Sequence, residues 1–179
     1  GTLHPPAEPQ PRSRLPAHPP AAPQPRLCLS STRLEALPSS FGHLPTLHTL
    51  RLCYNPNLAA LPESFGCLPA LQTLELHYSE CLTALPENFG HLPALHTLQL
   101  ETSRHSAHST CTTTPGNRCL DALPESFGYL PALRKLQLCY NHGLAALPES
   151  FGYLPALHTL QLRNNPDLAA LPESFGRLP

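Results

Sequence analysis

The sequence predicts a solenoid of stacked repeats, and three observations support this fold class. The string LAALPESFG occurs at residues 58–66, 144–152 and 168–176. Leucines that open this string or a variant of it are spaced by 24, 24, 38, 24 and 24 residues, and a period of about 20 to 50 residues is typical of solenoids. Leucine supplies 37 of the 179 residues while valine and isoleucine are absent, which disfavours the Val/Ile-rich strands of a doubly wound sheet or a β-sandwich.

Residues 1–26 precede the repeats and contain nine prolines. Because proline lacks an amide hydrogen and has a fixed φ, we expect a disordered, extended tail or linker. The stretch 12–19 approaches the R-x-L-P-x-x-P form of an SH3 ligand, but Ser13 stands where the arginine is required. We therefore favour a spacer over an SH3 ligand.

From Leu27 onward each unit carries the spacing L-x-x-L-x-L, shortened to two leucines in the first copy. These leucines and two more in the next segment, such as Leu58 and Leu61, can all point into one narrow interior. A single unit cannot close such a core, so neighbouring units must stack to bury it. The full copies are Leu47/Leu50/Leu52, Leu71/Leu74/Leu76, Leu95/Leu98/Leu100, Leu133/Leu136/Leu138 and Leu157/Leu160/Leu162.

Two further positions recur in each unit. All six phenylalanines occupy one repeat position, which predicts an internal stack along the convex side: Phe41, Phe65, Phe89, Phe127, Phe151 and Phe175. Asparagine at the ninth position of a unit can bond the backbone where a strand ends and bends. The residues there are Asn55, Asn141 and Asn165, with Thr32, Ser79 and Ser103 as replacements that can do only part of this work.

These motifs resemble the leucine-rich repeat family, L-x-x-L-x-L-x-x-N-x-x-L-x-x-L-P-x-x-F-x-x-L, over residues 27–179. The phrase LPESFGxLP is most similar to plant-type intracellular repeats and to repeats of bacterial effectors. The resemblance implies an α/β leucine-rich-repeat solenoid of about six rungs. In this architecture one parallel strand per repeat lies on the concave side, and turns or short helices lie on the convex side.

The resemblance also implies that a protein or peptide partner binds the concave face. Since equal repeat positions form columns across the rungs, the outward strand positions present a mixed, polar surface with tyrosine and arginine, the types that anchor interfaces. The predicted partner-binding residues are Arg51, Tyr54, Glu75, His77, Tyr78, Gln99, Glu101, Gln137, Tyr140, Gln161 and Arg163.

One column, formed by Cys53, His77 and Glu101 on consecutive rungs, has the order of a cysteine hydrolase and also three metal-ligand types. An open strand floor offers no oxyanion hole. The outer two Cα atoms would lie about 10 Å apart, which is wide for one tetrahedral ion. We therefore expect a variable binding surface here, with neither catalysis nor a metal.

The spacing of 38 residues indicates an insertion of 14 within a Ser/Thr-rich loop at about 102–118. We expect this loop to contact a partner. Its candidate contact residues are Arg104, His105, His108 and Arg118. Two alternatives stay open: zinc held by the two histidines with Cys111 and Cys119, and a disulfide between Cys81 and Cys119 on neighbouring rungs.

The composition excludes several function classes. A net charge of −1 with a single lysine, Lys135, provides no basic field for nucleic acid. No run of about 18 apolar residues predicts a membrane-spanning helix. The sequence contains no phosphate-binding or hydrolase motif, so no enzyme activity and no cofactor are predicted.

Two functional hypotheses follow. The first is a non-enzymatic, monomeric recognition module for a protein or peptide. The second is the sensor or substrate-recognition part of a larger enzyme or switch, such as a ubiquitin-ligase effector, a receptor kinase or a nucleotide-binding immune receptor. It is motivated by the absence of polar capping repeats, which indicates a fragment. Without glycosylation sequons or paired-cysteine caps, we expect a cytoplasmic location.

Overall fold

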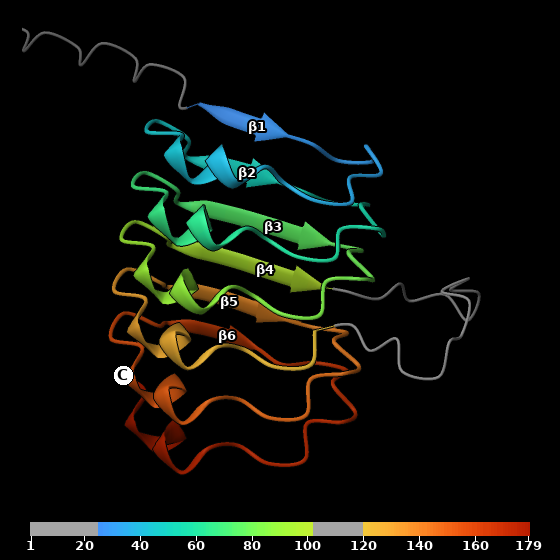
Figure 1. Cartoon of the computed structure of the whole chain (residues 1–179). Helices are drawn as coiled ribbons and strands as arrows, with labels where there is room; N and C mark the ends of the chain where they lie inside the picture. Colours follow the sequence, from blue (N-terminus) through green and yellow to red (C-terminus); the bar gives the residue numbers. More distant parts are fainter. Residues whose placement is uncertain (1–24, 102–119) are drawn as a thin grey trace, which may run out of the picture.

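The computed structural model describes residues 25–101 and 120–179 (Figure 1). In these residues, short strands alternate with 3₁₀ helices along the chain. The strands are β1 (Arg26–Cys28), β2 (Thr49–Arg51), β3 (Thr73–His77), β4 (Thr97–Glu101), β5 (Lys135–Leu138) and β6 (Thr159–Gln161). The helices are η1 (Ser39–His43), η2 (Glu63–Cys67), η3 (Glu87–His91), η4 (Glu125–Tyr129), η5 (Glu149–Tyr153) and η6 (Glu173–Arg177). None of these helices is long and apolar enough to cross a membrane.

The six strands of the described residues form one parallel sheet in chain order, β1 to β6 (Figure 1). Equal repeat positions pair with one another, so that Leu50 of β2 lies opposite Leu27 of β1 and Leu74 of β3. The first strand begins at Arg26, one residue before the predicted repeat region, because the backbone at Pro25 accepts hydrogen bonds from His48 and Thr49. This in-register stack confirms the predicted solenoid.

The long spacing between the third and fourth full copies does not interrupt the stack. Strands β4 and β5 pair directly, with Leu98 opposite Leu136. The amide of Leu120 donates to the carbonyl oxygen of Leu82 in the preceding rung at 2.8 Å. The predicted insertion at 102–118 lies outside the described residues, and the chain re-enters the repeat in register at Leu120.

The interior is filled by leucine from every side of each rung. In β3, Leu74 and Leu76 are fully buried, and they alternate with partly exposed residues on the other face. In the last rung Leu171 is 49% exposed, since it has a packed neighbour on one side only. Burial in this fold therefore comes from the adjacent rungs, and stacked leucines fill the interior in the absence of valine and isoleucine.

The convex side carries the 3₁₀ helices and the predicted phenylalanine stack. Each helix follows a proline, as Pro62 precedes η2, and the amide of Phe65 donates to the Pro62 carbonyl at 2.9 Å. Neighbouring Phe rings along the whole column have centroids 6.0 to 6.1 Å apart. Neighbouring strands in a sheet are only about 4.8 Å apart. The rungs therefore spread on the helix side, and the strands lie on the concave side, as predicted.

The asparagine position behaves as expected at three rungs. The side-chain amides of Asn55, Asn141 and Asn165 each donate to a backbone carbonyl of the preceding rung at 2.7 to 3.2 Å. Thr32 does part of this work by donating to a carbonyl oxygen at 2.9 Å. The prediction was wrong for Ser79, whose buried hydroxyl has no hydrogen-bond partner, because its side chain is too short to reach one.

Candidate binding face

The candidate site is the concave face of the sheet, where alternate strand residues point outward. In β3 the outward residues Thr73, Glu75 and His77 are partly exposed, while the leucines between them are buried. The same pattern holds in β4. Because the strand pleat has a period of two, residues i and i+2 share this face. Seven of the eleven predicted concave residues lie in the strands, with equal positions paired across the rungs: Arg51, Glu75, His77, Gln99, Glu101, Gln137 and Gln161. The other four, Tyr54, Tyr78, Tyr140 and Arg163, follow a strand by one to three residues.

Tyrosines follow the ends of three strands in an unusual backbone conformation. Tyr54, Tyr78 and Tyr140 have φ angles of 59°, 58° and 59°, in the left-handed region. Asn164 holds the same position and conformation in the last rung, with φ of 56°. The rings of Tyr54 and Tyr78 stack at a centroid distance of 4.5 Å. A tyrosine column, here meaning the stacked pair Tyr54 and Tyr78 and, two rungs further on, Tyr140, therefore follows the ends of the strands.

Polar side chains beside this column are held by contacts between rungs. Nε of Arg51 lies 2.9 Å from Oε2 of Glu75. The His77 ring has Nδ1 at 3.4 Å from Oε2 of Glu101, and Nε2 at 2.9 Å from Oε1 of Gln99. These contacts leave the side chains of Glu75 and His77 only 17% and 24% exposed. The middle of the face is therefore an ordered polar network across β2, β3 and β4.

A pocket of about 240 Å³ opens on the same face between β3 and β6. Its wall combines an acid, Glu101, a base, Arg163, and the aromatic ring of Tyr140. Two lining residues, Leu100 and Cys139, were not among the predicted partner-binding residues, and both are buried. The complete lining is His77, Leu100, Glu101, Gln137, Cys139, Tyr140, Gln161 and Arg163.

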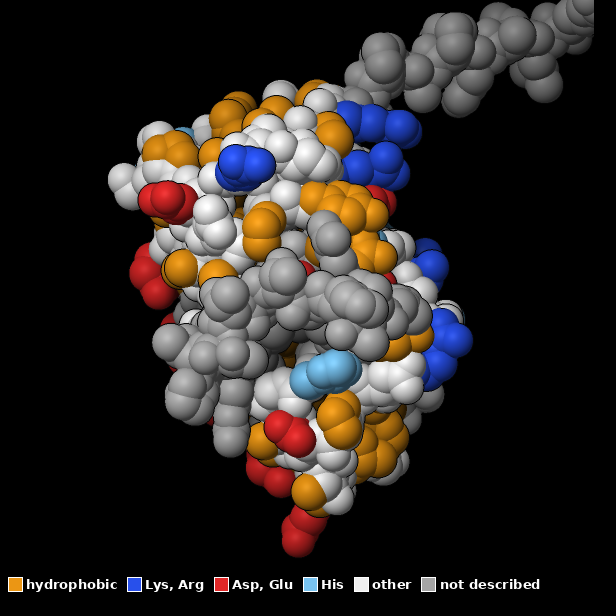
Figure 2. Space-filling model, turned by 90° about the vertical axis from the view of Figure 1, so that its right-hand side faces the viewer, with side chains coloured by type: hydrophobic (Ala, Val, Ile, Leu, Met, Phe, Trp, Pro, Cys, Tyr) orange, Lys and Arg blue, Asp and Glu red, His pale blue; other side chains and the backbone are white. Residues whose placement is uncertain are grey.

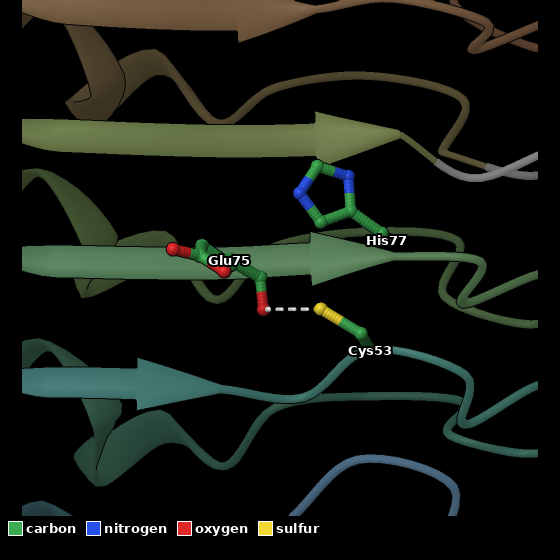
Figure 3. A group of neighbouring side chains, drawn as sticks. All are labelled: Cys53, Glu75 and His77. Carbon is green, nitrogen blue, oxygen red and sulfur yellow. Dashed lines mark hydrogen bonds between the residues drawn. The ribbon is translucent and has the colours of Figure 1, made fainter. Parts of the chain in front are cut away.

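Cys53, Glu75 and His77 bring three potential ligand atoms within 4.8 Å of one another (Figure 3). The Cys53 thiol points toward the Glu75 carbonyl, at a distance of 3.9 Å. Burial raises the pKa of this thiol. The sequence grouped Cys53 and His77 with Glu101 of the next rung, whereas the carboxylate that completes the group belongs to Glu75. The signal for Glu75 was present, since it stands two residues before His77 in one strand and must share its face.

The surface around the strand ends has mixed character. Figure 2 shows most Lys and Arg side chains toward one edge of this view, most Asp and Glu toward the other, and hydrophobic groups between them. The four predicted loop contacts, Arg104, His105, His108 and Arg118, lie outside the described residues. The same holds for Cys111 and Cys119, so the zinc and disulfide alternatives stay predictions.

This stacked sheet with convex turns defines the class of protein: a leucine-rich-repeat solenoid. Residues 45–104 match the family model named Leucine rich repeat. The chain is similar over 84% of its length to the leucine-rich repeat domain of the type III effector XopL, with 28% identity and a TM-score of 0.66. The chain therefore has the leucine-rich-repeat fold, and it spans 48% of the chain in that effector structure.

Two further solved structures share the fold. The plant peptide hormone receptor RGFR1, solved in complex with RGF2, is 24% identical over 80% of this chain and 21% of the receptor, with a TM-score of 0.56. A leucine-rich-repeat protein of Leptospira interrogans is 24% identical over 85% of this chain and 52% of its own, with a TM-score of 0.52. No curated protein sequence matches the chain.

Proposed function

We propose that this chain is a non-enzymatic recognition module that binds a protein or peptide through its concave face. The observation that carries the proposal is the tyrosine column formed by Tyr54, Tyr78 and Tyr140. Tyrosine brings a large contact area and a polar tip to an interface, at a low cost in side-chain entropy. Leucine-rich-repeat folds commonly mediate recognition, and one structural neighbour is a receptor bound to a peptide ligand.

The backbone at these tyrosines supports a binding function over a purely structural one. A left-handed conformation costs an ordinary side chain about 1 to 2 kcal/mol, whereas Asn tolerates it by local hydrogen bonding. Asn164 shows that the repeat accepts the less costly residue at this position. Retaining tyrosine at three rungs therefore places strain at one face of the molecule, as is common at functional sites.

The pocket beside the column supplies the second half of the proposed interface. Glu101 and Arg163 offer opposite charges, and Gln137 and Gln161 are joined by a 2.7 Å hydrogen bond between their side chains. Such a surface offers both hydrogen-bond donors and acceptors to an extended peptide, while the tyrosine rings can pack on the apolar side chains of that peptide. A partner that carries both apolar and charged residues fits it best.

The test starts from a randomised peptide library displayed on phage and selected on the folded chain. An enriched peptide is then titrated against the unchanged chain and against a variant carrying Tyr54→Asn, Tyr78→Asn and Tyr140→Asn. Asn is chosen because it suits the left-handed backbone, so the fold should persist. The matched control is Tyr129→Asn, which makes the same change at a convex tyrosine that is 63% exposed.

We expect the triple variant to bind at least about tenfold more weakly, as is typical when interface anchors are truncated, and the convex control to bind unchanged. Equal binding by the triple variant, or an equal loss in the convex control, would overturn the assignment of the concave face.

The alternative, in which this domain is the sensor or substrate-recognition part of a larger enzyme or switch, is supported by the likeness to the effector domain. In that setting the concave face would select the target and another domain would act on it. The cytoplasmic location, the plant-type assignment and the monomeric state belong to the same proposal. The test of this alternative is to measure binding of a target to the concave face in the full-length protein, both with and without that other domain.

A further inference from the structure

We propose that Cys53, Glu75 and His77 form a binding site for a thiophilic divalent metal ion of the Zn²⁺ class on the concave face. This inference is independent of the proposed recognition function, because it requires no partner. It concerns an ion that the three side chains bind together, one from the rung of β2 and two from β3.

The three side chains are already close to ligating geometry. Their candidate ligand atoms lie within 4.8 Å of one another, and all three side chains come from adjacent rungs (Figure 3). A tetrahedral zinc ion with bonds of about 2.0 to 2.3 Å holds its ligands about 3.3 to 3.8 Å apart. Approaches of about 1 Å per side chain close this gap, and these are within reach of side-chain torsions alone. The group of Cys53, His77 and Glu101 was too wide for one ion because it spans three rungs, whereas Cys53, Glu75 and His77 come from two neighbouring rungs.

The surrounding contacts resemble the outer shell of a metal site. A histidine that binds a metal through one ring nitrogen usually presents the other to a carboxylate, which fixes the ring. Here Nδ1 of His77 lies 3.4 Å from Oε2 of Glu101. That contact leaves Nε2 of His77 for the metal. Nε2 lies 2.9 Å from Oε1 of Gln99, so the partly exposed side chain of Gln99 must move away before an ion can bind Nε2.

Glu75 is also oriented by a neighbour. Nε of Arg51 binds Oε2 at 2.9 Å, which leaves Oε1 as the acceptor for an ion. The side chain of Arg51 is 53% exposed, so its charge is screened by water and opposes a nearby cation only weakly. The fourth coordination position faces the open concave surface and is left for water.

The donor set selects the class of ion. Thiolate and imidazole favour zinc and similar late transition metals, while magnesium and calcium prefer oxygen ligands only. Binding requires the Cys53 thiol to lose its proton, so affinity should rise with pH. Burial, which raises the pKa of that thiol, extends this dependence to higher pH.

The chain contains an internal control for the proposal. Cys139 stands at the same repeat position as Cys53, and its sulfur lies at the same 3.9 Å from the carbonyl oxygen of the next rung. The residues that correspond to Glu75 and His77 there are Gln161 and Arg163. That rung therefore offers a thiol in equal geometry beside an amide and a cation, and it should bind no metal.

The experiment is a titration of the full chain, kept reduced, with Co²⁺ as a spectroscopic probe, followed by competition with Zn²⁺. Binding at the proposed site gives a near-ultraviolet band from thiolate-to-cobalt charge transfer that saturates at one ion per chain, and Zn²⁺ removes it. Cys53→Ser should abolish the band, and His77→Ala should weaken Co²⁺ binding by more than tenfold. Glu101→Gln, which changes only the outer shell, should weaken it by about tenfold.

Cys139→Ser and the loop variant Cys111→Ser/Cys119→Ser are the matched controls and should keep the band. Far-ultraviolet circular dichroism confirms that each variant is folded. The proposal is overturned if no charge-transfer band forms, if the band survives Cys53→Ser, or if it disappears in either control. Loss of the charge-transfer band in the loop variant alone would mean that the ion binds in the insertion, and this result also contradicts the site at β2 and β3.

Discussion

The side-chain amide of Asn55 donates a 2.7 Å hydrogen bond to the carbonyl oxygen of Leu29 in the preceding rung. The same amide reaches the carbonyl oxygen of Leu52 in its own rung at 3.0 Å. One buried side chain thereby satisfies two backbone groups that leave the parallel ladder as the chain bends. Since a buried carbonyl without a partner is costly, this bond ties neighbouring rungs together at the strand ends.

Ser79→Asn should stabilise the protein. Ser79 is fully buried and its hydroxyl has no partner, whereas the amide of Asn55, at the same repeat position in the neighbouring rung, donates to the backbone carbonyl oxygens of Leu29 and Leu52. A longer amide can reach the corresponding carbonyl oxygens, so we expect a gain of about 1 kcal/mol and a rise in Tm of about 2 to 4 °C. Differential scanning calorimetry of the reduced chain measures it.

The reverse change, Asn55→Ser, is the control and should lower Tm, because it leaves backbone carbonyls unpaired. An unchanged or lower Tm for Ser79→Asn together with a lower Tm for Asn55→Ser would mean that the rung of Ser79 has no room for the amide.

Gly128→Ala should destabilise the fold severely, whereas Gly176→Ala should not. A Cβ atom at Gly128 would lie 1.8 Å from the backbone oxygen of Ser150 in the next rung, while at Gly176 it would meet nothing within 4 Å. The obstacle is backbone, so the rungs themselves would have to separate. We expect a loss of at least about 3 kcal/mol for the first change and less than about 0.5 kcal/mol for the second. Urea unfolding measures both changes in stability. Equal losses of stability would contradict the view that close contact between the backbones of neighbouring rungs requires glycine at position 128.

Cys28 should be alkylated faster than the other exposed cysteine of the described residues, Cys67. Hydrogen bonding between the Cys28 thiol and the side chain and backbone of Ser30 lowers the pKa of this thiol, which increases its thiolate fraction at pH 7 to 8. Ser30→Ala removes the larger contribution and should slow alkylation at Cys28 severalfold. Iodoacetamide labelling followed by peptide mass spectrometry gives both rates, with Cys67 as the reference that should not change.

The sequence predicted those parts of the fold that depend on one repeat position at a time. Leu74 and Phe65 are buried in their columns because the period alone decides which face they occupy. The left-handed backbone at Tyr78 was not predictable, because tyrosine gives no signal for it. The proximity of Glu75 to Cys53 was predictable only in part: the strand period places Glu75 on the face of His77, but its approach to Cys53 combines one repeat position with a different position of the next rung. Contacts of that diagonal kind depend on side-chain rotamers and on the pairing register between strands, which a repeat alignment does not contain.

The variant Asn164→Tyr should show how much folding stability is lost when tyrosine occupies the left-handed backbone position of the column. Asn164 is exposed and left-handed with φ of 56°, and tyrosine there would extend the column to the last rung. We expect a loss of about 1 kcal/mol from forcing an ordinary side chain into this backbone. The neighbouring change Arg163→Tyr, at an exposed residue without a positive φ, should leave stability within about 0.5 kcal/mol. Urea unfolding compares the two. If both variants are equally stable, the backbone at this position imposes no cost, and the retention of Tyr54, Tyr78 and Tyr140 would no longer argue for selection by a partner.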